Sequence, residues 1–161
     1  MKLSTRGRYA LRLMIDIAEL GNQQPRHLGD IAARQNISKR YLEHIVVSLK
    51  NNSLIRSTAG KHGGFVLARP PEEITVGDII EAAIGTINIV DCVMEPDICM
   101  SNDFCECRKV YEHVNGRVRE ALNETTLADI THKFQDQSGT DIAALSRTAC
   151  PLPRGKSERH V

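Results

Sequence analysis

The chain lacks tryptophan, and aromatic residues make up only 4% of its 161 residues. So few rings argue against a broad stacking platform for single-stranded nucleic acid. No apolar run reaches the roughly 18 residues that a transmembrane helix needs. The first eight residues also lack the apolar core of a signal peptide. We therefore expect a cytoplasmic protein with no membrane partner.

The rest of the composition is that of an ordinary globular protein, 41% hydrophobic and 25% charged. The net charge of +1 hides an asymmetry between the two halves. Residues 1–69 contain twelve Lys and Arg against four Asp and Glu, whereas residues 70–161 contain nine against sixteen. A basic half indicates a polyanionic partner, most simply nucleic acid. The alternative is that the charges only solvate two different surfaces.

Apolar residues recur at helical spacing in three segments of the basic half. This pattern predicts helices over residues 5–20, 28–35 and 39–51, with Ser38 as the N-cap of the third helix. The second and third helices are joined by a tight turn at residues 36–38. Two short helices joined in this way are typical of a helix-turn-helix.

Two short strands are predicted next, over residues 54–57 and 64–68, with a glycine-rich basic hairpin between them. A helix-turn-helix followed by such a hairpin is the arrangement of a winged helix, whose second motif helix enters the major groove. An ordinary turn is the alternative, and the spacing does not match a phosphate-binding P-loop. We predict a mainly α fold, with a winged helix-turn-helix domain over residues 1–85 and a small β-hairpin wing.

The acidic half contains a second long helical pattern, beginning near Phe104. Its apolar residues recur every four positions, which gives a narrow stripe typical of helix-on-helix packing. Packing between subunits and packing on the helix's own domain both remain open. The stripe consists of Val110, Val114, Val118 and Leu122.

The other segments of this half are assigned by the same patterns. A capped helix is predicted over residues 76–84, followed by a loop. We assign residues 104–134 to a long C-terminal helix, whose stripe makes it a candidate dimerisation helix, and a short last helix. Residues 135–161 lose all periodicity and are predicted to form a mobile tail.

Four cysteines, Cys92, Cys99, Cys105 and Cys107, fall within sixteen residues, and we define residues 86–107 as the cysteine-rich loop. In a reducing cytosol, clustered cysteines are more often metal ligands or redox sensors than structural disulfides. A helix N-terminus directly after the loop favours charged thiolates. Zinc and iron–sulfur clusters both accept such ligands. The alternatives are inert thiols, a reversible disulfide or adventitious metal.

Five segments, taken together, form a combination that is highly specific for one protein family. They are MKLSTRGRYAL at the start, ISKRYLE from residue 37, GGFVL from residue 63, ITVGDII from residue 74 and TTLADI from residue 125. Over residues 1 to about 130 the chain resembles the Rrf family of winged-helix transcription regulators. The resemblance implies a homodimer joined through the long C-terminal helix, bound to a pseudo-palindromic double-stranded DNA operator. It also implies an iron–sulfur cluster in the loop before that helix.

The resemblance identifies Cys92, Cys99 and Cys105 as the counterparts of the family's three cysteine ligands. In some members a histidine three residues after the third cysteine completes a 2Fe–2S site, but Arg108 stands there in this chain. Cys107 is the nearest candidate for a fourth ligand. The cluster is therefore either 2Fe–2S or 4Fe–4S.

The family's groove-facing positions fall on the third helix. Arg40 is suited to a guanine edge or a phosphate, and Glu43 to a cytosine amine. Tyr41 lies on the apolar stripe, so core packing is an equal alternative for it. In the wing, Ala59 replaces the arginine that the family often has, so other basic residues would supply that contact. The predicted DNA-binding residues are Ser38, Lys39, Arg40, Tyr41, Glu43, His44, Lys61 and His62.

These features predict a DNA-binding transcription regulator. Its operator affinity would be controlled by an iron–sulfur cluster that senses redox state, nitric oxide or iron and cluster status. The alternative is a DNA-binding regulator switched by thiol–disulfide or zinc chemistry at the same cysteines. An enzyme that pairs Cys105 with His113 is disfavoured, because nothing in the sequence implies an oxyanion hole or a substrate cleft.

Overall fold

The computed structural model describes residues 4–19, 24–60, 63–95 and 105–131. Within these ranges it is mainly helical, and none of its helices has the length and apolarity that crossing a membrane requires. A last helical segment covers residues 127–131. The predicted tail at 135–161 lies outside the described residues. The elements are α1 (Thr5–Glu19), α2 (Leu28–Gln35), α3 (Lys39–Asn51), β1 (Ile55–Thr58), β2 (Gly64–Leu67), η1 (Pro71–Glu73), α4 (Val76–Ile84), η2 (Asp91–Val93) and α5 (Glu106–Glu124).

The predicted helix-turn-helix is formed by α2 and α3. Asn36 ends α2 with a positive φ of 51°, and its backbone N–H donates to the last turn of that helix. Ser38 then begins α3, with its Oγ accepting a hydrogen bond from the backbone N–H of Tyr41 at 3.2 Å. A left-handed C-cap followed two residues later by a serine N-cap is what makes the turn tight.

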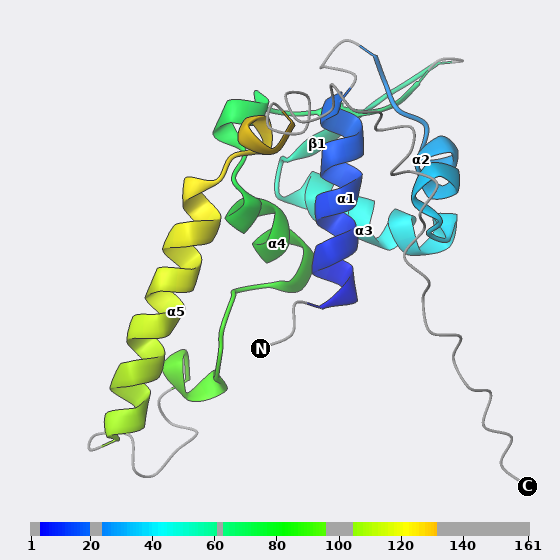
Figure 1. Cartoon of the computed structure of the whole chain (residues 1–161). Helices are drawn as coiled ribbons and strands as arrows, with labels where there is room; N and C mark the ends of the chain where they lie inside the picture. Colours follow the sequence, from blue (N-terminus) through cyan, green and yellow to red (C-terminus); the bar gives the residue numbers. More distant parts are fainter. Residues whose placement is uncertain (1–3, 20–23, 61–62, 96–104, 132–161) are drawn as a thin grey trace, which may run out of the picture.

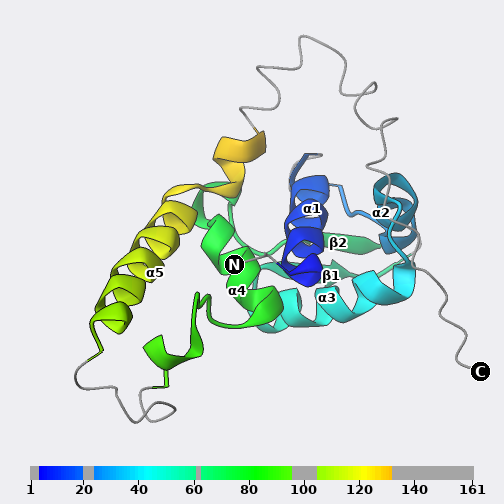
Figure 2. The same cartoon turned by 60° about the horizontal axis from the view of Figure 1, so that its bottom comes forward.

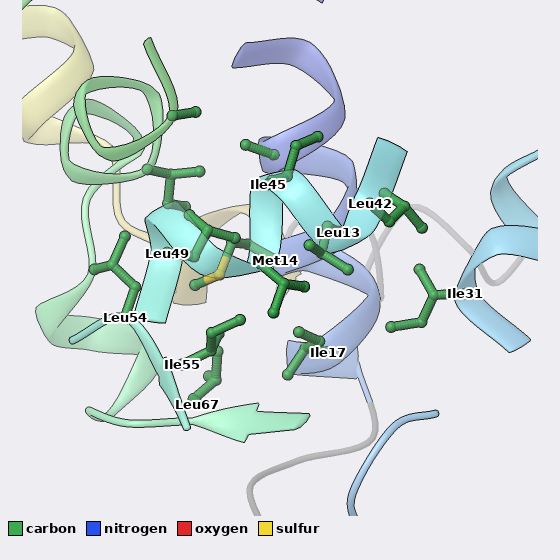
Figure 3. Packing of buried hydrophobic residues seen from close by; sticks show 14 of the residues in the cluster. Leu13, Met14, Ile17, Ile31, Leu42, Ile45, Leu49, Leu54, Ile55 and Leu67 are labelled. Atoms are coloured by element: carbon green, nitrogen blue, oxygen red, sulfur yellow. The ribbon is translucent and has the colours of Figure 1, made fainter. Parts of the chain in front are cut away.

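One hydrophobic core joins α1, α2, α3 and the hairpin, and Figure 3 shows how these elements contribute to it. A fully buried aliphatic side chain contributes about 1.5–3 kcal/mol relative to an exposed one, so this cluster dominates the stability of the domain. The labelled members are Leu13, Met14, Ile17, Ile31, Leu42, Ile45, Leu49, Leu54, Ile55 and Leu67.

The hairpin pairs β1 with β2 in antiparallel register, from Ile55 opposite Leu67 to Thr58 opposite Gly64. Both strands differ slightly from the predicted spans. Leu54 is not in β1, because its backbone N–H donates to the carbonyl of Leu49 at the end of α3, at 3.0 Å. β1 therefore begins one residue later than predicted, after Leu54 has donated its N–H to a carbonyl at the end of α3.

The wing is attached to the segment before α2. The backbone N–H groups of Arg26 and Phe65 each donate to the other's carbonyl at 2.9 Å. This pairing brings the Arg26 backbone very close to Gly64. A Cβ atom at Gly64 would lie 2.5 Å from the Arg26 carbonyl oxygen, so only glycine fits there.

We expect Gly64→Ala to lower the free energy of unfolding by about 2 kcal/mol, because the new methyl group overpacks against rigid backbone. Urea denaturation of the purified protein measures this. Gly29→Ala is the matched control, since nothing lies within 4 Å of a Cβ there. Alanine in place of this helical glycine should leave stability unchanged or raise it by up to about 1 kcal/mol. Equal stabilities for the two variants would contradict the close approach.

α4 contributes Ile79 and Ala83 to the same core and lies between α1 and α5 (Figure 1). It begins with a capping box, in which Thr75 accepts from the backbone of Asp78 and the Asp78 carboxylate accepts from the backbone of Thr75. Two backbone hydrogen bonds then hold the end of α5 beside the start of α4: Val76 N–H to Thr125 O at 2.9 Å, and Leu127 N–H to Ile74 O at 2.8 Å.

The apolar stripe of α5 has two different environments. Val118 and Leu122 pack against a small cluster of Val76, Ile80 and Ile87, so this half of the stripe covers its own domain. Val110 and Val114, in the half nearer the start of the helix, are 60% and 41% exposed. Figure 1 shows that half of α5 extending away from the winged-helix core.

Candidate nucleic-acid interface and cysteine-rich loop

α3 divides into a buried face and an exposed face. Figure 2 shows α3 at the lower edge of the domain, with α1, α2 and α4 on its other side. Leu42, Ile45, Val46 and Leu49 point into the core. The predicted DNA-binding residues of this helix and its N-cap are all exposed: Ser38, Lys39, Arg40, Tyr41, Glu43 and His44. Lys61 and His62 of the wing lie outside the described residues.

The exposed face of α3 combines both signs of charge. Lys39 Nζ lies 4.0 Å from the Glu43 carboxylate, an exposed i,i+4 pair that contributes little to stability. The pair nevertheless offsets part of the Glu43 charge at the point where a polyanion would approach. Lys50 Nζ, further along the helix, lies 3.5 Å from Ser57 Oγ in β1. Basic groups therefore occur at both ends of this face.

Tyr41 is not a core residue, because 37% of it is exposed. Its ring packs edge-on against Tyr9 of α1, with ring centroids 5.6 Å apart and an interplanar angle of 87°. The guanidinium of Arg12 lies 5.8 Å from the centroid of the Tyr9 ring. Aromatic and cation–π contacts of this kind fix ring orientation. Tyr41 is thus held in place at the edge of the exposed face.

A buried carboxylate, Asp16, was not singled out from the sequence. Only 2% of its side chain is exposed, and Arg34 donates to it through Nη2 at 2.6 Å and Nε at 3.1 Å. Gln35 Nε2 donates at 3.1 Å, and Arg26 Nε lies 3.7 Å away. Asp16 therefore links α1 to α2 and to the segment that pairs with the wing.

This ionic cluster changes the acid–base behaviour of its neighbours. The hydrogen bond to Asp16 raises the pKa of Arg34. Partial burial, followed by the charge of Asp16, raises the pKa of Glu19. The sequence signal for the cluster is a single carboxylate in the apolar stripe of α1, between Met14 and Ile17. A buried charge at such a position needs a partner.

The ends of the cysteine-rich loop are held on α5. Cys92 lies in η2 and Cys105 is the N-cap of α5, and both are free thiols of intermediate exposure. η2 packs on α5, beside its lower end in Figure 1. Asn115 of α5, which is 5% exposed, accepts a hydrogen bond from the backbone N–H of Ile89 at 3.2 Å. Cys99 lies outside the described residues.

Asn115 is a second residue that the sequence did not identify. It lies on the side of α5 that faces its own domain, where periodicity predicts only apolar residues. Its amide oxygen accepts from the backbone N–H of Ile89, two residues before η2 begins. This hydrogen bond positions Cys92 relative to α5. A buried asparagine with one partner of this kind is a positioning residue for the loop.

The remaining candidate ligands do not converge among the described residues. No group of three His, Cys, Asp or Glu side chains suited to a metal occurs in this part of the chain. Cys107 is exposed, and residues two apart at the start of a helix do not face each other, so it does not share a face with Cys105. Arg108, where the family has a histidine, pairs with Glu112 at 2.9 Å and has no lone pair to offer a metal.

The geometry excludes the pairing of Cys105 with His113. Cys105 precedes the first turn of α5, and His113 follows eight residues later. At 1.5 Å per residue, about 12 Å of helix axis separates them. A nucleophile and its base need hydrogen-bond contact.

Comparison with known proteins gives the family. A family model for Rrf2, described as an iron-dependent transcriptional regulator, matches residues 3–133. The chain belongs to the Rrf2 family of transcription regulators. It is 40% identical over 130 residues to protein rrf2 of Nitratidesulfovibrio vulgaris, covering 81% of this chain and 87% of the relative.

Solved structures of the Rrf2 family share the fold. The structure of CymR (YrzC), the global cysteine regulator of Bacillus subtilis, has a TM-score of 0.72 at 35% identity, with 83% of this chain and 98% of that chain covered. The structure of T. potens IscR has a TM-score of 0.72 at 31% identity, with coverages of 90% and 96%. The predictions of a winged helix and of a regulator that is not an enzyme are confirmed.

Proposed function

We propose that this Rrf2 regulator is a cytoplasmic homodimer whose operator affinity depends on an iron–sulfur cluster. Its ligands would be Cys92, Cys99 and Cys105. The observation that supports this is the position of the two proposed ligands that the structure describes. Cys92 and Cys105 are free thiols that bracket one short segment of the sequence, and both lie at α5. Thiolates beside a helix N-terminus suit iron–sulfur ligation.

When bound, the cluster would supply an iron centre that reacts with oxidants or nitric oxide. The residues of the chain itself would hold the loop and its thiols in position. Asn115 holds the segment that contains Cys92 on α5, and Cys105 lies directly before the first turn of α5. A conformational change of the cysteine-rich loop would therefore act first on the exposed half of α5.

DNA recognition is proposed for the exposed face of α3. In a winged helix this helix lies in the major groove, where Arg40 and Glu43 meet base edges and the hairpin meets the backbone. The basic first half of the chain supplies the electrostatic attraction. The exposed, solvent-facing position of these side chains supports the assignment.

The partner proposed for the exposed half of α5 is a second copy of the chain. Val110, Tyr111 and Val114 are large apolar side chains left exposed on one helix. A two-fold axis beside α5 would place two α3 helices on successive half-sites. The same helix would then connect the loop to the dimer interface.

Anaerobic purification tests the proposal through iron, acid-labile sulfide and visible absorption, together with affinity for a duplex selected from a random library. We expect coloured, iron-containing wild-type protein. Cys92→Ser should lose iron and change operator affinity by roughly tenfold, which lies within the usual range of allosteric coupling of about 5- to 150-fold. Cys150 is the one cysteine of the sequence outside the cysteine-rich loop, so Cys150→Ser is the matched control and should keep its iron. Colourless wild-type protein with the same operator affinity as Cys92→Ser would refute the cluster.

A thiol–disulfide or zinc switch at the same cysteines is the second candidate. The observation that favours it is that Cys92, Cys105 and Cys107 are all free thiols near one another in sequence. Zinc content and free-thiol counts before and after oxidation distinguish it from the cluster. Cys107→Ser measured for iron, sulfide and zinc further shows whether this exposed thiol is a ligand in either chemistry.

A further inference from the structure

A cavity of about 310 Å³ lies between the first turn of α1 and the middle of α3. Its lining residues are Arg6, Tyr41, His44 and Ile45. Arg6 reaches across from α1, and its Nη2 donates to Ser48 Oγ of α3 at 2.6 Å. The Nε of Arg6 is enclosed by protein and has no hydrogen-bond partner. The cavity is therefore lined by a guanidinium that is anchored to Ser48 through Nη2 and whose Nε has no partner.

The lining is suited to an anion. Arg6, His44 and Tyr41 bring N–H and O–H donors, and no acidic residue lines the cavity. An enclosed donor without a partner is unfavourable, so an acceptor that enters and lets the guanidinium turn toward it recovers free energy. A phosphate group fits because its oxygens can accept two parallel hydrogen bonds from one guanidinium.

The cavity lies on one flank of α3. Tyr41, His44, Ile45 and Ser48 are spaced as one stripe of a helix, next to the groove-facing Arg40 and Glu43. A helix with its side chains is about 10–12 Å wide, and the major groove is about 12 Å wide. When α3 fills the groove, its flanks must therefore face the phosphate backbones that form the groove walls.

We propose that Arg6, with His44 and Tyr41, forms a phosphate-binding site that contacts the DNA backbone beside α3. This inference rests on the proposed DNA binding by α3. Arg6 is absent from the DNA-binding residues expected from the sequence, because it belongs to α1. The hydrogen bond to Ser48 holds the guanidinium against α3 before DNA arrives, which lowers the entropy cost of the contact.

The test is the salt dependence of duplex binding by fluorescence anisotropy, on an operator duplex and on a random-sequence duplex. Each phosphate contact contributes about 0.9 to the slope of log K against log salt. Arg6→Gln should weaken binding to both duplexes by a similar factor and reduce the slope by about one. Arg6→Lys keeps the charge and should retain most of the slope. Ser48→Ala removes only the anchor and should leave the slope unchanged.

An unchanged slope for Arg6→Gln, or a loss confined to the operator duplex, would overturn this inference while leaving the proposed function intact. Wild-type protein that binds neither duplex would instead overturn the proposed function. Titration with inorganic phosphate distinguishes the two sources of the ligand. Millimolar phosphate binding that depends on Arg6, combined with an unchanged DNA slope, would assign the cavity to a free anion and overturn the DNA contact.

Discussion

Asp16→Ala is expected to lower the free energy of unfolding by about 3 kcal/mol. Removing one partner of a buried ion pair typically costs about 3–5 kcal/mol, because the other charge is left uncompensated. Asp16 is 2% exposed and accepts from Arg34 at 2.6 and 3.1 Å. The Arg34 side chain is 43% exposed and can be rehydrated, which places the cost at the lower end of that range. Urea denaturation monitored by far-ultraviolet circular dichroism measures the change.

Asp30→Ala is the matched control, since it removes an exposed carboxylate from the first turn of α2. Its expected cost is below about 1 kcal/mol. The double variant Asp16→Ala with Arg34→Ala should cost less than the sum of the two single changes, because the pair is coupled. A loss below about 1 kcal/mol for Asp16→Ala, or strict additivity in the cycle, would show that the buried cluster contributes little to folding.

Periodicity predicted α2, α3 and α4 with their observed bounds, for a physical reason. Leu42, Ile45 and Leu49 recur at helical spacing because one face of α3 is buried in the core. Ser38 and Thr75 mark the starts of α3 and α4, because a side-chain oxygen must satisfy the free N–H groups there. Burial pattern and cap agree, so both the type and the position of the helix are specified locally.

Asp16 and Asn115 could not be predicted in this way. Each is a polar residue on a buried helix face, and its partner is distant in sequence: Arg34 lies 18 residues from Asp16, and Ile89 lies 26 residues from Asn115. Periodicity records only whether a position is polar. The favourable partner appears only when α1 meets α2, or when the loop meets α5.

The stripe on α5 illustrates another limit. Val110, Val114, Val118 and Leu122 are equivalent in sequence, yet only the last two pack on their own domain. The four-residue spacing of apolar side chains predicts that this face of α5 packs against another apolar surface. It does not predict whether that surface belongs to the same chain or to another one. The cysteines are similar, because spacing identified Cys92 and Cys105 as candidate ligands, whereas the position of Cys92 beside α5 came from the packing of η2 on that helix.

Val114→Asp is expected to convert the protein to a monomer and to weaken operator binding by about 100-fold or more. A charge at the centre of an apolar helix contact is desolvated without a partner. Val114 is 41% exposed in the single chain, so the substitution should leave the monomer folded. Binding through one half-site also forfeits the avidity gained by linking two, which is commonly 10²–10⁴. Sedimentation velocity and anisotropy measure the two effects.

His113→Asp is the matched control for the dimer. It introduces the same negative charge one residue away, and successive residues of a helix point about 100° apart. His113 is also exposed, so the variant should remain dimeric and keep its operator affinity. If Val114→Asp sediments as a dimer, the exposed half of α5 is not the subunit interface. If it is monomeric yet binds the operator like wild type, the dimer is not what positions the two α3 helices on DNA.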